Sequence, residues 1–356
     1  MSIPITYIRS SSYNCHEMCE MKSFAEYTLG WNGPSNKSAD RGTIVHKVME
    51  ILAGIKLAYQ NKEESFTDSD VGYDISLKDV NMWDIDVDDI TSKCYTYYTT
   101  GFSHHKWEES DWKTCKKLVH KALIYREGYF DPRNQKILQP EERFDIPLNF
   151  DWAKYEFEID GEIIVGQLRL KGTIDLITEI EDDTIEIVDY KTGRKVNWAT
   201  GKEITYQSLQ NNFQLRQYHL ASTILYPNYE HILSTIYYIN FDAPFTLSFG
   251  RSDIPETLQM IRTKFERIRD TKIPELTRTW KCRKFCHQGT STFEGTNVVP
   301  LEQTENGDYL TKPGQMMTKC DQLKYLFKYR PIELIIEHMS KEDYSVTKYK
   351  APGEIE

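Results

Sequence analysis

Two charged residues end a stretch in which apolar and acidic residues alternate, DTIEIVDYKTGR at residues 183–194. Side chains alternate between the two faces of a β-strand, so Asp189 and Lys191 share one face. The stretch then breaks at a Thr-Gly pair. A carboxylate beside an ammonium at the end of a strand is more typical of a chemical site than of packing in a core.

Three further motifs contain residues that bind metal ions or organise a polar site. They are G-x-x-x-H ending at His46, G-T-I-D ending at Asp175, and Q-x-x-x-Y from Gln214 to Tyr218. We expect His46 on a helix and Asp175 on the strand before residues 183–194. Gln214 and Tyr218 are four residues apart, so a helix places both side chains on one face.

Hard divalent cations explain these residue types. Mg²⁺ and Mn²⁺ prefer carboxylate and carbonyl oxygens, and Mn²⁺ also accepts imidazole nitrogen. Adjacent antiparallel strands would bring Asp175 and Asp189 within reach of one ion, and the backbone carbonyl of Tyr190 is a further ligand. Such an ion polarises a phosphoryl oxygen and lowers the pKa of bound water. Lys191 would orient that water and offset negative charge on the phosphate.

In this order, the four motifs resemble the RecB-type branch of the PD-(D/E)XK nuclease superfamily. That branch includes helicase-associated recombination nucleases, CRISPR adaptation nucleases and phage or mitochondrial DNA exonucleases. The motifs span residues 42–218. The resemblance implies a metal-dependent DNA exonuclease. It assigns His46, Asp175 and Asp189 to the metal ion, Lys191 to catalysis, and Gln214 and Tyr218 to positioning the motif or the DNA. The Tyr190 carbonyl is added to the metal ligands by its place between Asp189 and Lys191.

Each motif alone also fits an ordinary structural role. The histidine alone fits a packed or surface side chain, the G-T-I-D aspartate a turn, and the Asp-Lys pair an exposed salt bridge. The Gln-Tyr pair alone fits a helix with one surface and one core residue. The four motifs together, each on the expected kind of element, favour a site. Glu141 and Glu142 precede the strands where relatives often carry an acid, and the sequence does not decide between them.

Seven cysteines indicate a second metal centre. In an intracellular chain, clustered thiols bind metal more often than they form disulfides. Cys15 and Cys19 are four residues apart, and so are Cys282 and Cys286. On a helix, this spacing places both thiols of a pair on one face.

Some RecB-type nucleases bind a [4Fe–4S] cluster through one cysteine before the first long helix and three late ones. The ligands that this resemblance implies here are Cys19, Cys282, Cys286 and Cys320. The chain departs from the pattern, because relatives usually show a C-x2-C pair with a third cysteine close behind. Here Cys320 lies 34 residues after a C-x3-C pair. Cys15 and His287 are alternative ligands, structural Zn²⁺ is the alternative metal, and unliganded thiols are the third interpretation.

The resemblance and the apolar spacing together predict an α/β protein with a PD-(D/E)XK, restriction-endonuclease-like core, a mixed sheet with a strand meander flanked by helices. Three-and-four spacing predicts helices at residues 14–31, 40–60, 107–130, 206–227, 254–274 and 316–329. Period-two alternation predicts an antiparallel meander of about four strands between residues 142 and 193, and a buried strand at 231–241. We expect the tail, residues 275–356, to be otherwise irregular.

We expect one nuclease domain, residues 1–356, interrupted by an acidic, helical insertion at residues 61–135. We expect a cysteine-containing segment at residues 275–356, stapled by metal to the N-terminal helix. The net charge of −10 is concentrated locally, because residues 61–90 hold ten acids against two lysines, a net of −8. Residues 251–290 hold ten Arg or Lys against five acids, so a basic surface for DNA remains.

The sequence contains no apolar run of the ~20 residues that span a bilayer and no signal peptide. We therefore expect no membrane association and an intracellular, cytoplasmic protein, or one in the host-cell cytoplasm if it is phage-encoded. The expected partner is DNA, at ends or as single strands, in recombination, repair or replication. A helicase phosphate loop is missing from the sequence, so unwinding would require a partner protein. The alternatives are a structure-specific endonuclease on the same core and a non-catalytic DNA-binding scaffold subunit.

Overall fold

The computed structural model describes residues 3–159, 161–197, 201–283, 286–290, 298–303, 309–313 and 318–343. The chain divides into two compact units. The first unit comprises Met1–Pro34, Pro147–Leu170 and Leu258–Glu356, and the second comprises Ser35–Ile146 and Lys171–Thr257. Each unit is therefore built from segments that are far apart in the sequence.

The described helices are α1 (Ser10–Met18), α2 (Glu20–Ser23), α3 (Lys37–Gln60), α4 (Val87–Gly101), α5 (Glu109–Ile124), α6 (Tyr206–Gln210), α7 (Phe213–Leu225), α8 (Ile254–Asp270), α9 (His287–Thr290), α10 (Lys319–Leu326) and α11 (Ile332–Asp343). The described strands are β1 (Tyr7–Ile8), β2 (Ser65–Asp68), β3 (Tyr73–Ser76), β4 (Lys136–Pro147), β5 (Lys154–Ile159), β6 (Glu162–Gln167), β7 (Arg169–Glu181), β8 (Thr184–Lys191), β9 (His231–Tyr238), β10 (Ala243–Phe249), β11 (Val298–Gln303) and β12 (Tyr309–Pro313). Among these helices, none is long and apolar enough to cross a bilayer.

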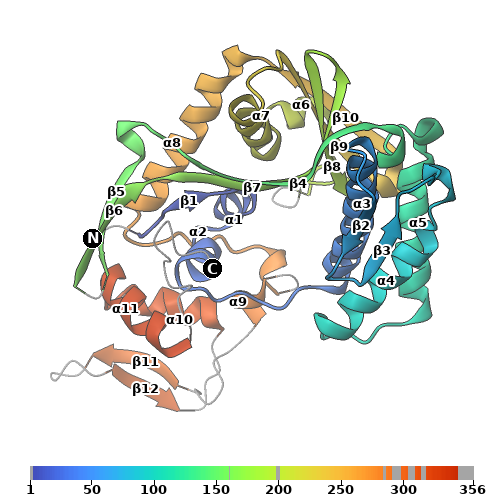
Figure 1. Cartoon of the computed structure of the whole chain (residues 1–356). Helices are drawn as coiled ribbons and strands as arrows, with labels where there is room; N and C mark the ends of the chain where they lie inside the picture. The colour runs from blue at the N-terminus through green and yellow to red at the C-terminus, as the bar shows by residue number, and fades with distance from the viewer. Residues whose placement is uncertain are drawn as a thin grey trace. The chain divides into compact units, whose positions relative to one another are not determined.

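A mixed sheet in the order β1-β7-β8-β9-β10, with β4 also beside β7, is the main sheet (Figure 1). β7 and β8 pair antiparallel, β8 and β9 pair parallel, and β9 and β10 pair antiparallel. A parallel pair needs a crossover connection, and α6 and α7 provide it between β8 and β9. The predicted α/β class with a mixed sheet and flanking helices is confirmed.

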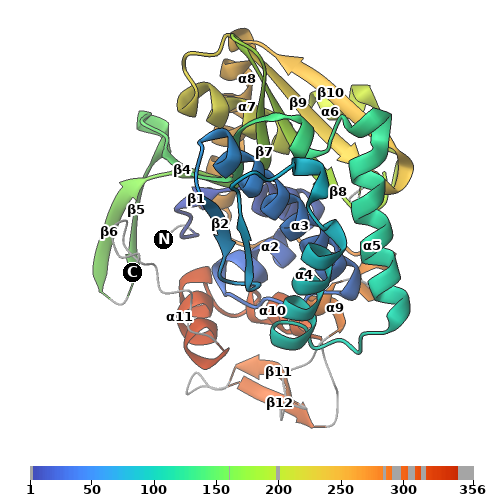
Figure 2. The ribbon, with the colours of Figure 1, turned by 45° about the vertical axis from the view of Figure 1, so that its right-hand side comes forward.

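The two faces of the sheet in the second unit have different cores. Val188, Tyr190 and Tyr237 pack with the residues of α3, α4 and α5. Ile236 and Tyr238 belong to the core formed with α6 and α7. Alternate residues of β9 therefore face opposite helical layers, as the period of a strand requires. Figure 2 shows α3, α4 and α5 grouped beside the β2–β3 hairpin.

Several sequence expectations differ from the structure. The predicted helix at residues 14–31 is interrupted at Cys19, whose backbone is extended between α1 and α2. The predicted helix at residues 107–130 ends at Ile124. The expected meander is split, because β5 and β6 pair only with each other among the described strands. The expected helix at residues 206–227 breaks into α6 and α7, because the Asn212 side chain accepts a hydrogen bond from Leu215 N and caps a new helix. The tail contains the β11–β12 hairpin and α11 besides α10, whereas only one helix was expected there. Residues 316 and 317 of that predicted helix lie outside the described residues.

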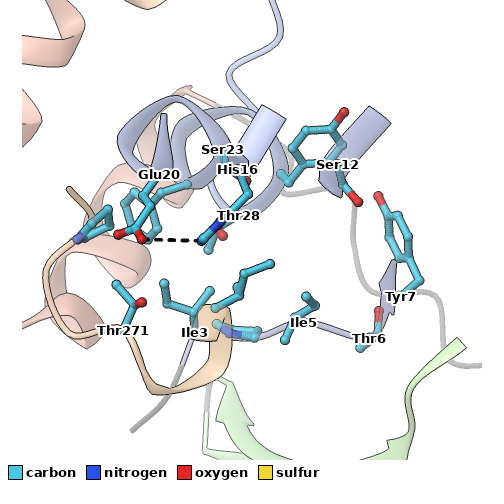
Figure 3. A pocket seen from close by; sticks show the side chains of 15 residues that line it. Ile3, Ile5, Thr6, Tyr7, Ser12, His16, Glu20, Ser23, Thr28 and Thr271 are labelled. Atoms are coloured by element: carbon cyan, nitrogen blue, oxygen red, sulfur yellow. Dashed lines mark ion pairs between the residues drawn. The ribbon is translucent and has the colours of Figure 1, made fainter. Parts of the chain in front are cut away.

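A small cavity in the first unit lies between α1, α2 and the segment that contains β1 (Figure 3). His16 lines it, with Nδ1 3.2 Å from Lys264 Nζ. Burial and the Lys264 ammonium lower the pKa of His16 to about 4, so the imidazole is neutral at neutral pH. The cavity of about 40 Å³ has room for only a few water molecules. It is therefore too small to hold a nucleotide.

Candidate functional site

The two predicted metal-binding aspartates lie on adjacent strands of the main sheet. Leu176 of β7 pairs with Val188 of β8, and Asp175 and Asp189 each lie one residue beyond that pair. The antiparallel pairing explains why motifs fourteen residues apart meet at one end of the two strands. The carboxylate of Asp175 accepts a 2.8 Å hydrogen bond from the backbone N–H of Tyr190, which fixes its orientation.

An imidazole and two carboxylates converge at this end of the strands. His46 comes from α3, and its Nδ1 lies 3.3 Å from Asp175 Oδ2. Glu141 of β4 completes the group, and one ligand atom from each of the three residues lies within 4.8 Å of the others. This is the donor set that hard divalent cations bind, with imidazole nitrogen acceptable to Mn²⁺.

Glu141 is the residue that sequence reasoning could not assign. In the structure, the side chains of Glu141 and Glu142 contact different groups. Glu142 accepts a 3.0 Å hydrogen bond from Tyr226 Oη, whereas Glu141 faces His46 and Asp175. The backbone of Glu141 is left-handed, with φ of 46°, which costs a non-glycine residue about 1–2 kcal/mol. Such strain clusters at functional sites.

A second polar group lies next to the first. Lys191 Nζ is 2.6 Å from Asp189 Oδ2, as expected for two residues on one face of a strand. Gln214 of α7 donates a 2.8 Å hydrogen bond to Asp189 Oδ1, and its amide also lies 2.8 Å from Tyr218 Oη. Tyr218 in turn donates a 2.6 Å hydrogen bond to the backbone carbonyl of Thr173. The Q-x-x-x-Y motif thus connects α7 to both strands that carry the aspartates.

One residue of α7 that the sequence analysis did not single out extends this connection. Gln217 Nε2 donates a 2.6 Å hydrogen bond to the backbone carbonyl of Lys171 on β7. Its position three residues after Gln214 places it near the same side of the helix, and this spacing was the available signal. Gln217 also lies against Gly172, where a Cβ atom would approach its Nε2 to 2.9 Å.

Gly42, the glycine of G-x-x-x-H, has no side chain where α3 passes close to Thr192. A Cβ atom at Gly42 would lie 2.8 Å from Thr192 Oγ1. Thr192 directly follows Lys191, so Gly42 allows α3 to pass close to the end of β8. That approach carries His46, one turn further along α3, to Asp175. The motif therefore combines a packing residue and a functional residue.

The charges of the two groups depend on one another. Burial alone would lower the pKa of His46, but the Asp175 carboxylate outweighs it and raises that pKa to about 9. Burial raises the pKa of Asp189, and the nearby Asp175 carboxylate adds to this rise. Burial also raises the pKa of Glu141, with contributions from Asp175 and Glu50, to about 7. Buried acids this close together favour a bound cation between them.

Five cysteines lie in the first unit, and Cys19, Cys282, Cys286 and Cys320 lie near one another. Burial raises the pKa of Cys320 to about 12, and the neighbouring Cys19, Cys286, Asp321 and Cys282 contribute to the rise. Cys19 also belongs to a core cluster in which α10 packs on the N-terminal helices, and Cys320 packs against that cluster. Cys15 instead donates a 3.5 Å hydrogen bond to Glu26 Oε2.

The chain turns tightly from Cys286 to Gly289, beside Cys282. The backbone N–H of Gly289 donates a 3.0 Å hydrogen bond to the carbonyl of Cys286. A Cβ atom at Gly289 would clash with the backbone carbonyl of Cys282. Only glycine therefore lets the chain return this closely past Cys282. The carbonyl of Trp31 accepts a hydrogen bond from Gln288, which ties this turn to the N-terminal segment.

A comparison with protein-family models agrees with this geometry. The family model described as the PD-(D/E)XK nuclease superfamily matches residues 10–288. Among solved structures, the chain is similar to a "putative exonuclease" from Eubacterium rectale at 10% sequence identity and a TM-score of 0.43. That similarity covers 82% of this chain and 90% of the other. No curated protein matches the chain.

Proposed function

Because the chain belongs to the PD-(D/E)XK nuclease superfamily, we propose that it hydrolyses DNA phosphodiester bonds with a divalent cation, acting at DNA ends or on single strands. The observation that carries the proposal is the adjacency of two groups. One is a cation-binding set of His46, Glu141 and Asp175. The other is a buried carboxylate paired with an ammonium, Asp189 and Lys191. Phosphodiester hydrolysis needs both near one phosphate.

The cation would be Mg²⁺ or Mn²⁺, held by His46, Glu141 and Asp175, with Asp189 and the Tyr190 carbonyl as further ligands. When bound, it polarises a phosphoryl oxygen and lowers the pKa of a water molecule. The protein orients these ligands before the ion arrives. The Tyr190 N–H fixes Asp175. Gln214 holds Asp189 Oδ1, whereas Lys191 pairs with the other oxygen, Oδ2.

Lys191 is the proposed catalytic residue. Its side chain is 33% exposed, whereas that of Asp189 is 2% exposed, so the ammonium is the accessible member of the pair. A phosphate that approaches the site would meet this ammonium, which offsets developing negative charge and orients the attacking water. Gln214 and Tyr218 are positioning residues, because they act on Asp189 and on the backbone of β7.

An assay with end-labelled linear single-stranded DNA, linear duplex DNA and covalently closed circles tests this function. We expect linear DNA to be degraded with Mg²⁺ or Mn²⁺ and to stay intact with EDTA, because the acids need a cation to engage a phosphate. Closed circles should survive, since an end-dependent enzyme finds no substrate in them. Cleavage of the circles would favour a structure-specific endonuclease. Bound but intact DNA would favour a scaffold subunit.

The two neighbouring glutamates provide a matched test of the cation site. We expect Glu141→Gln to weaken Mn²⁺ binding by about tenfold or more, because it removes one carboxylate from the donor set. Glu142→Gln should leave Mn²⁺ affinity unchanged, since its carboxylate bonds to Tyr226. Calorimetric titration of Mn²⁺ into both variants measures this. Equal affinities in the two variants would remove Glu141 from the site.

We assign the cysteines to a [4Fe–4S] cluster with Cys19, Cys282, Cys286 and Cys320 as ligands. The cysteines close enough to Cys320 to affect its pKa are the other three of this set, which supports their selection. Cys15 is the alternative fourth ligand, because it lies close enough to Cys19 to raise its own pKa while it donates a hydrogen bond to Glu26. Structural Zn²⁺ at the same thiolates is the alternative. Either metal would fix α10 to the N-terminal helices and would thereby stabilise the first unit.

A further inference from the structure

A groove of about 520 Å³ opens in the second unit between the start of α4 and the end of α5. We call it the Trp83 groove, after its largest exposed residue. The lining residues that matter here are Trp83, Asp86, Asp88, Ile124, Glu127 and Arg133. The proposed nuclease residues do not line it, so the groove is a separate feature of the unit.

Two large apolar side chains project at the groove. Trp83 is 59% exposed, and Ile124 is 72% exposed. The guanidinium of Arg133 lies over the Trp83 ring, 5.2 Å from its centroid. Arg133 is itself held by Asp131, with contacts of 3.0 Å and 2.7 Å to the two carboxylate oxygens. Arg133 therefore holds the Trp83 ring in place. An aromatic side chain that is already ordered loses little conformational entropy when a partner binds it.

A strained turn sets the position of the other apolar residue. Arg126, Glu127 and Gly128, directly after the end of α5, have φ values of 43°, 57° and 85°. Two consecutive non-glycine residues in this region cost about 1–2 kcal/mol each. The Asn134 side chain donates a 3.0 Å hydrogen bond to the Gly128 carbonyl and holds the turn. The turn ends the helix at Ile124, leaving that side chain and Glu127 at the groove.

The charge of the groove selects the occupant. Four carboxylates line it, those of Asp86, Asp88, Glu127 and Asp131. Asp131 pairs with Arg133, and Asp88 pairs with Lys116 at 2.5 Å and with His120 at 2.8 Å. The carboxylates of Asp86 and Glu127 therefore supply the negative charge that a ligand would meet. It also lies beside the stretch of residues 61–90 that holds ten acids and two lysines. DNA phosphates are repelled by such a surface, whereas lysine and arginine side chains are attracted. Basic charge around an apolar side chain is the complement of this groove.

We propose that the Trp83 groove is the docking site for a partner protein, which inserts a basic segment with a large apolar side chain between lysines or arginines. The apolar side chain packs on Trp83 and Ile124, and the flanking cations meet Asp86 and Glu127. This docking does not depend on nuclease activity, so its failure and a failure of the nuclease proposal are separately visible.

Fluorescence anisotropy with a labelled synthetic peptide that alternates leucine and lysine tests the proposal. We expect the peptide to bind the full-length protein, and Trp83→Ala to weaken binding by about tenfold. Glu127→Lys should weaken binding and reduce its salt dependence, because one attractive charge becomes repulsive. Phe102→Ala is the matched control, since Phe102 is 62% exposed in the same unit and does not line the groove.

Two control peptides test separately the contribution of the basic charges and that of the apolar side chain. A peptide with glutamate in place of lysine and a peptide with serine in place of leucine should both fail to bind. The proposal is overturned if the leucine-lysine peptide does not bind, or binds Trp83→Ala as tightly as wild type. It is equally overturned if labelled single-stranded DNA binds the wild-type groove and Trp83→Ala or Glu127→Lys changes that affinity, because the occupant would then be nucleic acid.

Discussion

Replacement of Lys191 by alanine is expected to lower the rate of DNA cleavage by about 10³-fold without unfolding the protein. The side chain is 33% exposed, so its loss leaves little cavity. The loss to catalysis has two physical sources. The phosphate would lose the ammonium that offsets its developing charge. Asp189, whose pKa is raised mainly by burial, would lose the ammonium that counteracts this rise. Single-turnover cleavage of end-labelled DNA and a melting temperature measure the two outcomes.

Lys195→Ala is the matched control for this prediction. Lys195 lies four residues after Lys191 and pairs with Glu203 at 2.8 Å, away from the aspartates. We expect its removal to leave the cleavage rate within about threefold of wild type, the scale of an ordinary surface ion pair. If Lys191→Ala cut DNA as fast as wild type, Lys191 would not be the catalytic residue. If both variants lost activity equally, the loss would reflect charge in the segment rather than chemistry at Asp189.

The second large effect concerns the thiolates of the first unit. We expect Cys320→Ser to abolish retention of the metal and to lower the melting temperature by roughly 10 °C. A metal that binds only the folded state stabilises it by about 4 kcal/mol at a thousandfold excess over its Kd, and each kcal/mol corresponds to about 2–4 °C. Anaerobic purification followed by iron and zinc analysis, visible absorption and thermal unfolding measures the effect. About four iron atoms per wild-type chain would identify the cluster.

Two other cysteines make this experiment specific. Cys15→Ser should retain the metal, because the proposed set of Cys19, Cys282, Cys286 and Cys320 is complete without Cys15, whose thiol donates to Glu26. Cys115→Ser should also retain it, since Cys115 is buried in the core of the second unit. Loss of iron from Cys15→Ser together with full iron in Cys19→Ser would make Cys15 the ligand. Zinc in place of iron would decide for the alternative metal, and wild-type protein without either metal would contradict the centre altogether.

Much of the site could be read from local spacing. Alternation along residues 183–194 places Asp189 and Lys191 on one face, and the structure has them 2.6 Å apart. The helical interval between Gln214 and Tyr218 places their side chains together, and they lie 2.8 Å apart. Both inferences concern neighbours within one element. There, the geometry of the backbone alone determines which side chains meet, whatever the element packs against.

The choice between Glu141 and Glu142 and the contact of Gly42 with Thr192 became visible only in the folded chain. Each depends on how two elements that are distant in sequence approach each other. Spacing within one element carries no information about that approach. The Trp83 groove also depends on the tertiary structure. Trp83 and Ile124 become neighbours through the packing of α4 and α5 and through the strained turn after α5. The residue types, and the face of the helix or strand on which each residue lies, follow from the sequence alone. The partners of each side chain follow from packing between elements, because contacts across elements depend on the shape of the whole core.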